Sequence, residues 1–597
     1  MLLQKFFVSL CILWINLVKL NLAVSVIRDT PAGVIEGFTD TVTFNGVAKP
    51  ITRFLGIPFA ESPTGANRFR KPVPKAKFDG VFRADKSPIS CIQSTQSGVE
   101  AFSGSSNFSE DCLMLNVYVP SDFSSTPVSS SLPVMVWIYG GGFSQGGTSW
   151  YNPDVLSTVT NTIIVTLNYR VGFFGFLQSK DGSIKGNQGL WDQHLAFQWV
   201  NKNIGMFNGS PGMVTIFGES AGSVSVLYQA MYPGNKGLFQ RVIAESGSPL
   251  AFWALIEPNA EKYFETVGCL TADPLTCVST KSYSELQVSD SFIFAPTVDG
   301  DFLLESPHDV LYGDNAATQP ARDFFHSLDV LTGVNNFDGA ISFAYLGYSV
   351  TGFDFNNTRI TRDQLRNQIF LNEVKNIVDI NNVDTNTINL IADMLEFEYI
   401  NWSDPDSFNT TRMAAVNFYN DKDFFMPAVK VTYAHALHAT TGGTYFYEYA
   451  PKKKTHLIAL PTWLEGSNHG DELMSVFGPV FDFVNVTEFT SPEESELAKI
   501  MMTMWTNFAR SGNPNTPHDV TKFIHTTWPE YDMTSQQYLE FSYQMSTDSV
   551  KSRFYARRMD LWNDIIPSIV KFGQARTTTT TTPKPLPIDL SGIIGKK

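Results

Sequence analysis

The sequence is poor in cysteine and histidine, and it has no basic tract. Of its 597 residues, five are cysteine and nine are histidine, and charged residues make up 17%. Acidic side chains outnumber basic ones by 58 to 43, which gives a formal net charge of −15. A chain without a basic stripe lacks the electrostatic footprint of a nucleic-acid binder, so we expect no nucleic-acid partner.

Long hydrophobic runs are also missing, with one exception at the N-terminus. Lys5 precedes an apolar stretch from Phe6 to Val18, and small residues follow near Ala23. The stretch is too short for a comfortable membrane span, and this order is typical of a secretory signal peptide. The alternative is a short buried segment. We expect a signal peptide over residues 1–23, a secreted protein, and no stable membrane anchor.

The few cysteines fit an oxidising compartment. Cys11 lies in the expected signal peptide, and the other four cysteines allow three pairings. Their spacing favours Cys91–Cys112 and Cys269–Cys277, each of which closes a local loop. Sequons for N-glycosylation point the same way, although such short motifs also arise by chance. They begin at Asn107, Asn208, Asn356, Asn401, Asn409 and Asn485.

No internal repeat is sustained along the chain, and its composition supports a large packed core, with 43% hydrophobic and 13% aromatic residues. The C-terminal end differs. Ala575 to Pro587 is a Thr/Pro run that cannot form a core, and it predicts an extended stalk that is a candidate for O-glycosylation. We therefore expect one α/β domain over residues 24–573 and a disordered tail over residues 574–597.

A short motif indicates nucleophilic chemistry. Val214 to Phe217 is β-branched and aromatic, as in a buried parallel strand, and Ala221 to Tyr232 has a helical pattern. Between them, Gly218 to Gly222 fits G-x-S-x-G, the nucleophile elbow. The alternative is that Ser220 is one more small residue in a tight bend. The strand–turn–helix setting favours Ser220 as a nucleophile, which then needs oxyanion donors and a base.

The donors are predicted upstream. A hydrophobic strand from Leu132 to Tyr139 runs into three glycines and Phe143. Glycines let backbone N–H groups face a ligand without interfering side chains, and a further donor would be the N–H of Ala221, directly after the nucleophile. A flexible loop between strands is the alternative.

One histidine stands out as the base. His469 lies between glycines in a polar loop and is C-terminal to Ser220, as the chain order of such sites requires. The acid should lie between them. Val330 to Phe343 begins as an apolar strand and ends in a loop with Asp338, but spacing alone makes Asp338 one of many acids. The remaining histidines lie in helical patterns or in segments without supporting chemistry: His194, His435, His438, His308, His326, His456, His518 and His525.

Taken together, several stretches resemble the type-B carboxylesterase/cholinesterase family, in that family's order, from about Val24 to Phe572. The resemblance implies an α/β-hydrolase fold, with a large, mostly parallel central sheet flanked by helices and long loops that form an active-site gorge. The stretches are FLGIPFAESPTG (54–65), EDCLMLNVYVP (110–120), WIYGGGF (137–143), NYRVGFFGFL (168–177), the segment 186–223 and NHGDELMSVFG (468–478).

The resemblance also implies the role of each site residue. The family's G-x-x-x-D-E-G segment aligns with residues 333–339, so Asp338 stands where the family has a glutamate. An aspartate is one methylene shorter than a glutamate, so its backbone must lie closer to His469 for the carboxylate to reach the imidazole. The mechanism needs no metal or organic cofactor. The implied roles are nucleophile Ser220, base His469, acid Asp338, oxyanion hole Gly141, Gly142 and Ala221, the two disulfides above, and the structural ion pairs Arg68–Glu110 and Arg170–Asp192.

The expected substrate is a neutral, apolar ester, either a small molecule or a lipid. A quaternary ammonium needs an aromatic face, and cholinesterases place a tryptophan in the loop closed by the first disulfide. Here residues 92–111 contain Phe102 and Phe108 but no tryptophan. By analogy the substrate pocket would include Trp253 and Phe292, while Glu219 and Tyr139 are compatible with a cationic site. The alternative for both Trp253 and Phe292 is ordinary core packing.

Three other functions remain as alternatives: a bile-salt-activated-type lipase, a cholinesterase, and a non-catalytic adhesion or receptor ectodomain. The last is disfavoured because all three triad positions are filled. The sequence predicts no particular oligomeric state.

Overall fold

The computed structural model describes residues 24–93, 108–120, 131–257, 260–287, 294–345, 359–378, 383–479, 489 and 491–578. Several predictions lie outside these residues: the signal peptide, Phe292, the sequons at Asn107, Asn356 and Asn485, and the tail from residue 579.

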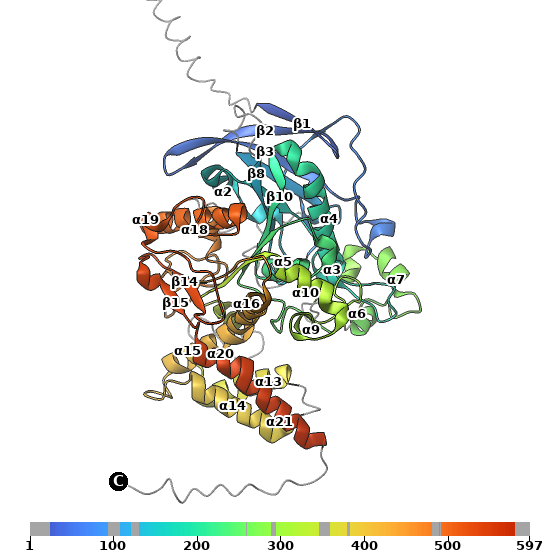
Figure 1. The fold of residues 1–597 in the computed structure, drawn as a ribbon. Coiled ribbons are helices and arrows are strands. Elements are labelled where there is room, and N and C mark those ends of the chain that lie inside the picture. Colours follow the sequence, from blue (N-terminus) through green and yellow to red (C-terminus); the bar gives the residue numbers. More distant parts are fainter. Residues whose placement is uncertain are drawn as a thin grey trace, which may run out of the picture.

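The described strands form one thirteen-stranded sheet and a separate two-stranded one (Figure 1). At its centre β9, β8, β10, β11, β12, β13 and β14 lie side by side and run parallel. Antiparallel strands β1, β2, β3 and β7 extend one edge, β4 pairs with β2, and β15 closes the other edge. The bounds are β1 Ser25–Thr30, β2 Gly33–Phe44, β3 Val47–Pro58, β4 Val81–Arg83, β5 Ser90–Cys91, β6 Phe108–Ser109, β7 Met114–Pro120, β8 Leu132–Ile138, β9 Ile163–Leu167, β10 Gly209–Glu219, β11 Arg241–Glu245, β12 Asp329–Asn335, β13 Thr444–Tyr449, β14 Gln537–Phe541 and β15 Val550–Ser552.

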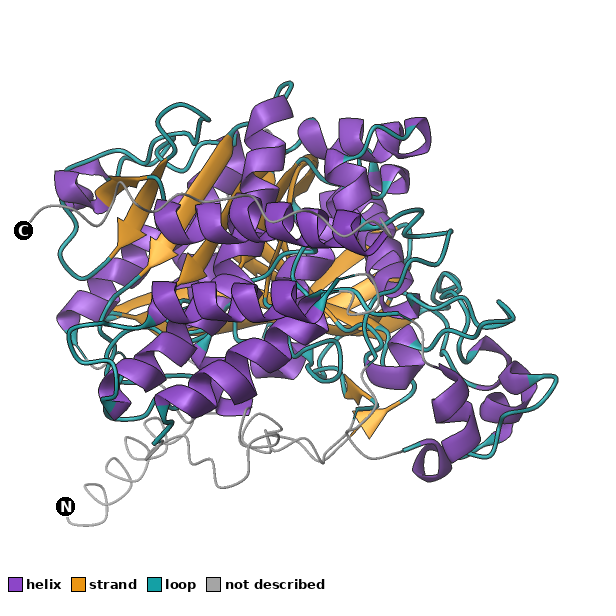
Figure 2. Ribbon diagram, turned by 90° about the horizontal axis from the view of Figure 1, so that it is seen from below, coloured by secondary structure: helices purple, strands orange, loops and turns teal. Residues whose placement is uncertain are grey.

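Helices cover both faces of this sheet (Figure 2), with α4, α5 and α10 on one side and α2 and α18 on the other (Figure 1). The α-helices are α2 Asp154–Thr160, α3 Gly172–Phe176, α4 Gln188–Asn203, α5 Ala221–Ala230, α6 Ala260–Thr266, α7 Pro274–Thr280, α8 Tyr283–Leu286, α9 Pro307–Tyr312, α10 Gln319–His326, α11 Ala340–Tyr345, α12 Arg362–Gln364, α13 Leu371–Ile377, α14 Thr385–Tyr399, α15 Phe408–Tyr419, α16 Met426–His438, α17 Leu473–Phe477, α18 Pro492–Ser511, α19 Thr521–Ile524, α20 Ala556–Asp560 and α21 Ile566–Thr578. Three π-helical turns are η9 Leu365–Phe370, η10 Asn420–Phe425 and η13 Leu561–Ile565.

The central strands are apolar along their whole length because both of their faces are covered. Every residue of β8 and of β9 is buried, which a strand with one solvated face would not show. The structure thus confirms the predicted sheet, large and mostly parallel, flanked by helices.

The sheet's register brings distant segments to one edge. Ile138 of β8 pairs with Gly218 of β10, Glu219 of β10 pairs with Glu245 of β11, and Glu245 pairs with Gly333 of β12. The segments that follow β8, β10 and β12 therefore leave the sheet close together. These segments carry the glycine loop, Ser220 and Asp338.

A lobe of helices lies beyond the sheet, at the bottom of Figure 1, and includes α13, α14, α15 and α21. Its residues Phe370, Leu395 and Phe418 belong to a second apolar cluster, which also includes Val334 and Phe446 of the sheet. Helix α21 runs to Thr578, five residues into the segment predicted to be an extended tail. Gln574, Ala575 and Arg576 favour a helix and prolong it before the threonine run begins.

Disulfides join Cys91 to Cys112 and Cys269 to Cys277. Within the described part of the chain, no helix combines the length and the apolar character that a membrane span requires.

Candidate active site

Ser220 lies in a strained turn between β10 and α5. Its backbone has φ 59° and ψ −125°, a conformation that residues with side chains rarely adopt. The turn is held because the Ser220 N–H donates to the Glu245 carbonyl at 2.9 Å. The flanking glycines allow α5 to approach β8: a Cβ atom on Gly222 would lie 2.0 Å from the Ile138 carbonyl oxygen, and one on Gly218 2.6 Å from it. This is the geometry of a nucleophile elbow.

The glycine loop after β8 lies beside this turn. A Cβ atom on Gly140 would lie 2.9 Å from the Ser220 Cβ. Gly141 and Gly142 have positive φ, 106° and 61°, and both are at least partly exposed. None of the hydrogen bonds between described residues uses the N–H of Gly141, Gly142 or Ala221. Ala221 is also the first residue of α5, where the helix dipole is positive. These three donors are therefore available to an anion next to Ser220.

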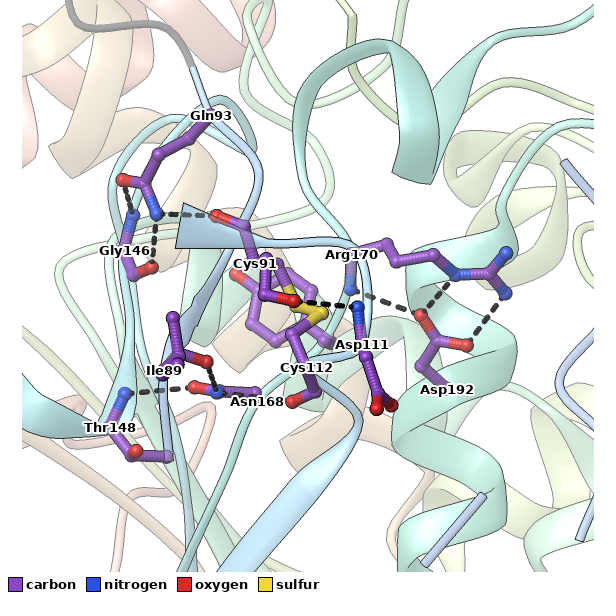
Figure 3. The surroundings of a disulfide bond; sticks show 12 residues. Ile89, Cys91, Gln93, Asp111, Cys112, Gly146, Thr148, Asn168, Arg170 and Asp192 are labelled. Atoms are coloured by element: carbon purple, nitrogen blue, oxygen red, sulfur yellow. Dashed lines mark hydrogen bonds and ion pairs between the residues drawn. A yellow bond between two sulfur atoms is a disulfide. The ribbon is translucent and has the colours of Figure 1, made fainter. Parts of the chain in front are cut away.

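The first disulfide supports the far end of this loop (Figure 3). Gln93, two residues after Cys91, forms two hydrogen bonds with Gly146: its Nε2 donates to the carbonyl at 2.8 Å and its Oε1 accepts from the N–H at 2.9 Å. Asn168 accepts from the N–H of Thr148 at 3.0 Å and donates to the Cys112 carbonyl at 3.1 Å. Both cysteines are thus connected to the residues that end the glycine loop.

His469 and Asp338 form a buried pair. The Nδ1 of His469 lies 3.0 Å from Asp338 Oδ1, within hydrogen-bond distance. Asp338 is fully buried, and the exposed fraction of His469 is 5%. The ring of Phe424 lies against the imidazole, with 4.8 Å between the ring centres. The short aspartate thus reaches the histidine, because the two backbone segments are themselves bridged at Phe337 and Asn468.

Glu219 lies at the other ring nitrogen. Its Oε1 is 3.0 Å from His469 Nε2, close enough for an ion pair, but the contact lacks the angle of a hydrogen bond. We describe it as a close electrostatic contact. In the described structure no aligned hydrogen bond joins Ser220 to His469, which is common in hydrolases without a bound substrate.

The Glu219 carboxyl belongs to an unusually acidic interior. Burial, together with the negative charge of Asp338 and Glu245, raises the pKa of Glu219 well above its usual value. Burial also raises the pKa of Glu245 to about 8, although the Trp505 N–H donates to it at 2.5 Å. Burial and the charges of Glu219, Glu245 and Asp338 raise the pKa of Glu472 as well. These glutamates therefore ionise at a higher pH than exposed glutamates do.

Trp253 and Tyr139, the two other predicted pocket residues that the structure describes, lie in different surroundings. Trp253 is partly exposed, donates from its indole N–H to the Asp423 carbonyl at 3.1 Å, and packs near Phe424, the residue that contacts the imidazole. Tyr139, in contrast, is fully buried, and its hydroxyl donates to the Tyr169 carbonyl at 2.7 Å. Its ring also stacks on that of Tyr169. Tyr139 therefore supports the glycine loop and does not line a pocket, which corrects the prediction.

The predicted scaffold pairs are confirmed. Arg68 Nε donates to Glu110 at 2.8 Å, and Arg170 binds Asp192 through Nε and Nη2 at 2.8 and 2.7 Å. Among the described sequons, Asn401 and Asn409 are exposed, whereas Asn208 is half-buried in a left-handed conformation with φ 68°.

Four residues near the pair were not predicted from the sequence: Asn335, Asn336, Asn420 and Phe424. The Asn-Asn dipeptide before Asp338 reads as an ordinary turn, and residue 420 is more than 80 positions away. Only the fold brings them to the site.

A strained serine beside free backbone donors, with a histidine and an acid from later segments, defines an α/β-hydrolase of the serine type. The comparisons with known proteins agree. Residues 24–562 match the carboxylesterase family. The chain is 33% identical to an acetylcholinesterase of Bungarus fasciatus over 573 residues, which cover 90% of this chain and 88% of the relative. It is 33% identical to a cholinesterase of Mus musculus over 567 residues, 89% and 87% of the two chains. It is 31% identical to a bile salt-activated lipase of Bos taurus over 581 residues, 91% and 89%. The chain belongs to the carboxylesterase family and is a serine carboxylic ester hydrolase.

Proposed function

We propose that this protein is a secreted esterase that hydrolyses neutral, apolar esters with Ser220 as nucleophile, His469 as base and Asp338 as the orienting acid. The observation that carries the proposal is the buried His469–Asp338 pair at the same sheet edge as the strained Ser220. The catalytic domain would cover residues 24–573.

The reaction would proceed through an acyl-enzyme. His469 Nε2 takes the proton of the Ser220 hydroxyl as its oxygen attacks the ester carbonyl carbon, and the carbonyl oxygen becomes an oxyanion held by the N–H groups of Gly141, Gly142 and Ala221. When the carbon–oxygen bond of the ester breaks, the alcohol leaves with the proton from Nε2. Water then attacks the acyl-enzyme by the same relay. Asp338 accepts the Nδ1–H throughout, which keeps Nε2 available as the base.

The preference for neutral esters rests on two features. Residues 92–111 contain no tryptophan to face a quaternary ammonium. Burial raises the pKa of Glu219, the acid next to His469 Nε2, which reduces the negative charge that it offers to a cation. Trp253, which packs near Phe424 beside the imidazole, would form a wall of the acyl pocket.

Secretion is supported by the two disulfides, since such bonds persist in oxidising compartments, and by the exposed sequons at Asn401 and Asn409.

The test compares p-nitrophenyl butyrate with acetylthiocholine on protein purified from the medium of a eukaryotic secretory host. We expect a higher kcat/KM for the neutral ester, inhibition by an organophosphate, and a loss of about 10⁴-fold or more in kcat for Ser220→Ala. A higher kcat/KM for the choline ester would overturn the proposed substrate class. Wild-type turnover by Ser220→Ala would overturn the proposed nucleophile.

A further inference from the structure

The position of the Asp338 carboxylate depends closely on its backbone, because a single methylene separates the two. Oδ1 lies 3.0 Å from His469 Nδ1, and Oδ2 accepts the backbone N–H of Asn335 at 2.7 Å. Both oxygens are thus committed, and the side chain has little freedom to follow a displaced partner. The turn from Asn335 to Gly339 must therefore be fixed relative to the segment that carries His469.

Asparagine side chains fix the turn on one side. Asn335 Nδ2 donates to the carbonyl of Asn468, the residue before the histidine, at 2.7 Å. Asn336 Oδ1 accepts the N–H of Ser467 at 2.9 Å. In addition, the Phe337 N–H donates to the Ser467 carbonyl at 3.0 Å. Three hydrogen bonds thus join the acid turn to the two residues before His469.

A third asparagine holds the turn from the opposite side. Asn420 lies at the start of η10, and its Oδ1 accepts the Gly339 N–H at 2.7 Å while its Nδ2 donates to the Asn336 carbonyl at 3.0 Å. The fit is tight, since a Cβ atom on Gly339 would lie 2.1 Å from the Asn420 nitrogen. The same π-helical turn places Phe424 against the imidazole. Such turns are frequent at functional sites.

We propose that Asn335, Asn336 and Asn420 form an amide clamp that positions Asp338 against His469 for catalysis. The proposal rests on the proposed function, in which this pair activates Ser220. The three are positioning residues, because their side-chain amides bond the acid turn and the segment before His469. Their removal should therefore change kcat and leave KM nearly unaltered. A misplacement of about 1 Å in such a pair costs on the order of 10²-fold in rate.

The test uses Asn336→Ala and Asn420→Ala, each made in the wild type and in an Asp338→Glu background. Asn335 is left intact because its amide also donates to Glu472. With p-nitrophenyl butyrate we expect each single variant to lose about 10- to 100-fold in kcat with KM within about twofold. In the Asp338→Glu background the loss should be smaller, because a longer side chain can follow the displaced histidine.

A matched control separates positioning from general stability. Asn203 is also a buried asparagine with bonds on two sides: its Oδ1 accepts the Ala32 N–H at 2.9 Å and its Nδ2 donates to the Trp199 carbonyl at 2.8 Å. Asn203→Ala should lower Tm and leave kcat unchanged. If an alanine variant fails to fold, Asn336→Ser and Asn420→Ser, which retain a polar group, replace it with the same expectations.

Wild-type kcat in folded Asn336 and Asn420 variants would overturn the clamp, and so would an equal loss of kcat in both acid backgrounds. Neither result affects the proposed function, which fails instead if Ser220→Ala retains turnover.

Discussion

At the residue scale, the protonation state of Glu219 sets the charge that lies next to the Nε2 atom of His469. The Glu219 carboxyl oxygen lies 3.0 Å from His469 Nε2, the nitrogen that accepts the Ser220 proton in the proposed mechanism. An ionised carboxylate there would hold a proton on Nε2, so that fewer rings would be free to accept the Ser220 proton. Burial and the neighbouring acids raise the pKa of Glu219 well above its usual value, so the group ionises at a higher pH than an exposed glutamate does.

Glu219→Gln tests this arrangement, because an amide mimics the uncharged acid at every pH. We expect kcat on a neutral ester at pH 7 to stay within about tenfold of wild type. On the alkaline side the wild-type kcat/KM should fall as Glu219 ionises, and the variant should lack that fall. A pH profile from 5.5 to 9.5 for both proteins makes the comparison. The same alkaline fall in both would contradict the argument.

The acid itself gives a second prediction. Asp338→Asn should keep the fold and the site, but its amide can hold the imidazole in the wrong tautomer, and a comparable change in a serine protease costs about 10⁴-fold in kcat. Asp338→Glu retains the charge and should keep measurable activity. Equal melting curves for the two variants provide the control. A folded Asp338→Asn enzyme with wild-type turnover would remove Asp338 from the triad.

The sequence predicted site residues where a local motif or a family position exists, and it missed those that depend on packing. Ser220 and His469 lie in recognisable local settings, and Asp338 was found through the family alignment. The burial of Tyr139 was missed because a strand-end tyrosine can face a pocket or the core, and its partner Tyr169 lies on another segment. Asn420 was missed because no local pattern connects it to Asp338.

At the element scale, Gln93 connects the Cys91–Cys112 disulfide to the glycine loop, because it bonds both the Cys91 carbonyl and Gly146. Replacing both cysteines by serine should lower the free energy of unfolding by about 3 kcal/mol, given the separation of 21 residues. It should also lower kcat, because the loop that carries the proposed oxyanion donors Gly141 and Gly142 loses this support. Denaturant unfolding and steady-state kinetics measure the two effects.

The other disulfide supplies the control. Cys269 and Cys277 are separated by 8 residues, so their replacement should cost a similar amount, about 2.5 kcal/mol. This pair belongs to a separate apolar cluster around Tyr263 and Phe264, and kcat should remain unchanged. If both double variants lose kcat equally, the loop support is not specific to the first disulfide.

Elements were predicted well where periodicity and composition agree. The apolar runs of β8 and β10 and the helix after Ser220 lie close to their expected places. The π-helical turn η10 was not predictable, because it continues a helix from α15 into α16 without a change of pattern. The end of α21 was predicted too early. The threonines after residue 576 dominate the composition of this segment, but Gln574, Ala575 and Arg576 favour a helix and prolong it.

At the scale of the whole molecule, the location of the protein follows from features spread along the chain. Expressed in a eukaryotic secretory host, it should appear in the medium without about its first two dozen residues. Glycan should be found at the exposed Asn401 and Asn409, as mass spectrometry of tryptic peptides would show. Retention in the cytosol, with Cys91 and Cys112 reacting as free thiols, would contradict this prediction.

The buried acids also determine how stability depends on pH. Burial raises the pKa of Glu245 to about 8 and that of Glu448 to about 7, above the value of about 4.3 in an unfolded chain. The folded state then binds more protons than the unfolded state between these values, so the contribution is present below about pH 4.3 and is lost as the pH rises to about 8. Buried histidines act oppositely. Burial lowers the pKa of His435 to about 3, so stability is lost as the pH falls below about 6.5.

Above about pH 6.5 His435 is neutral in both states, so the raised acids alone predict a Tm that falls as the pH rises towards 8. Melting curves from pH 4 to 9 test this directly. Glu245→Gln keeps an acceptor for the Trp505 N–H but cannot ionise, so its Tm should fall less than that of the wild type between pH 6 and 8. If the Tm of the wild type rises over that interval, or if the variant falls as steeply, the buried acids do not control stability. The pH dependence of the Tm would then be attributed to surface charges. In that case it should weaken with added salt, because salt screens exposed charges far more than buried ones.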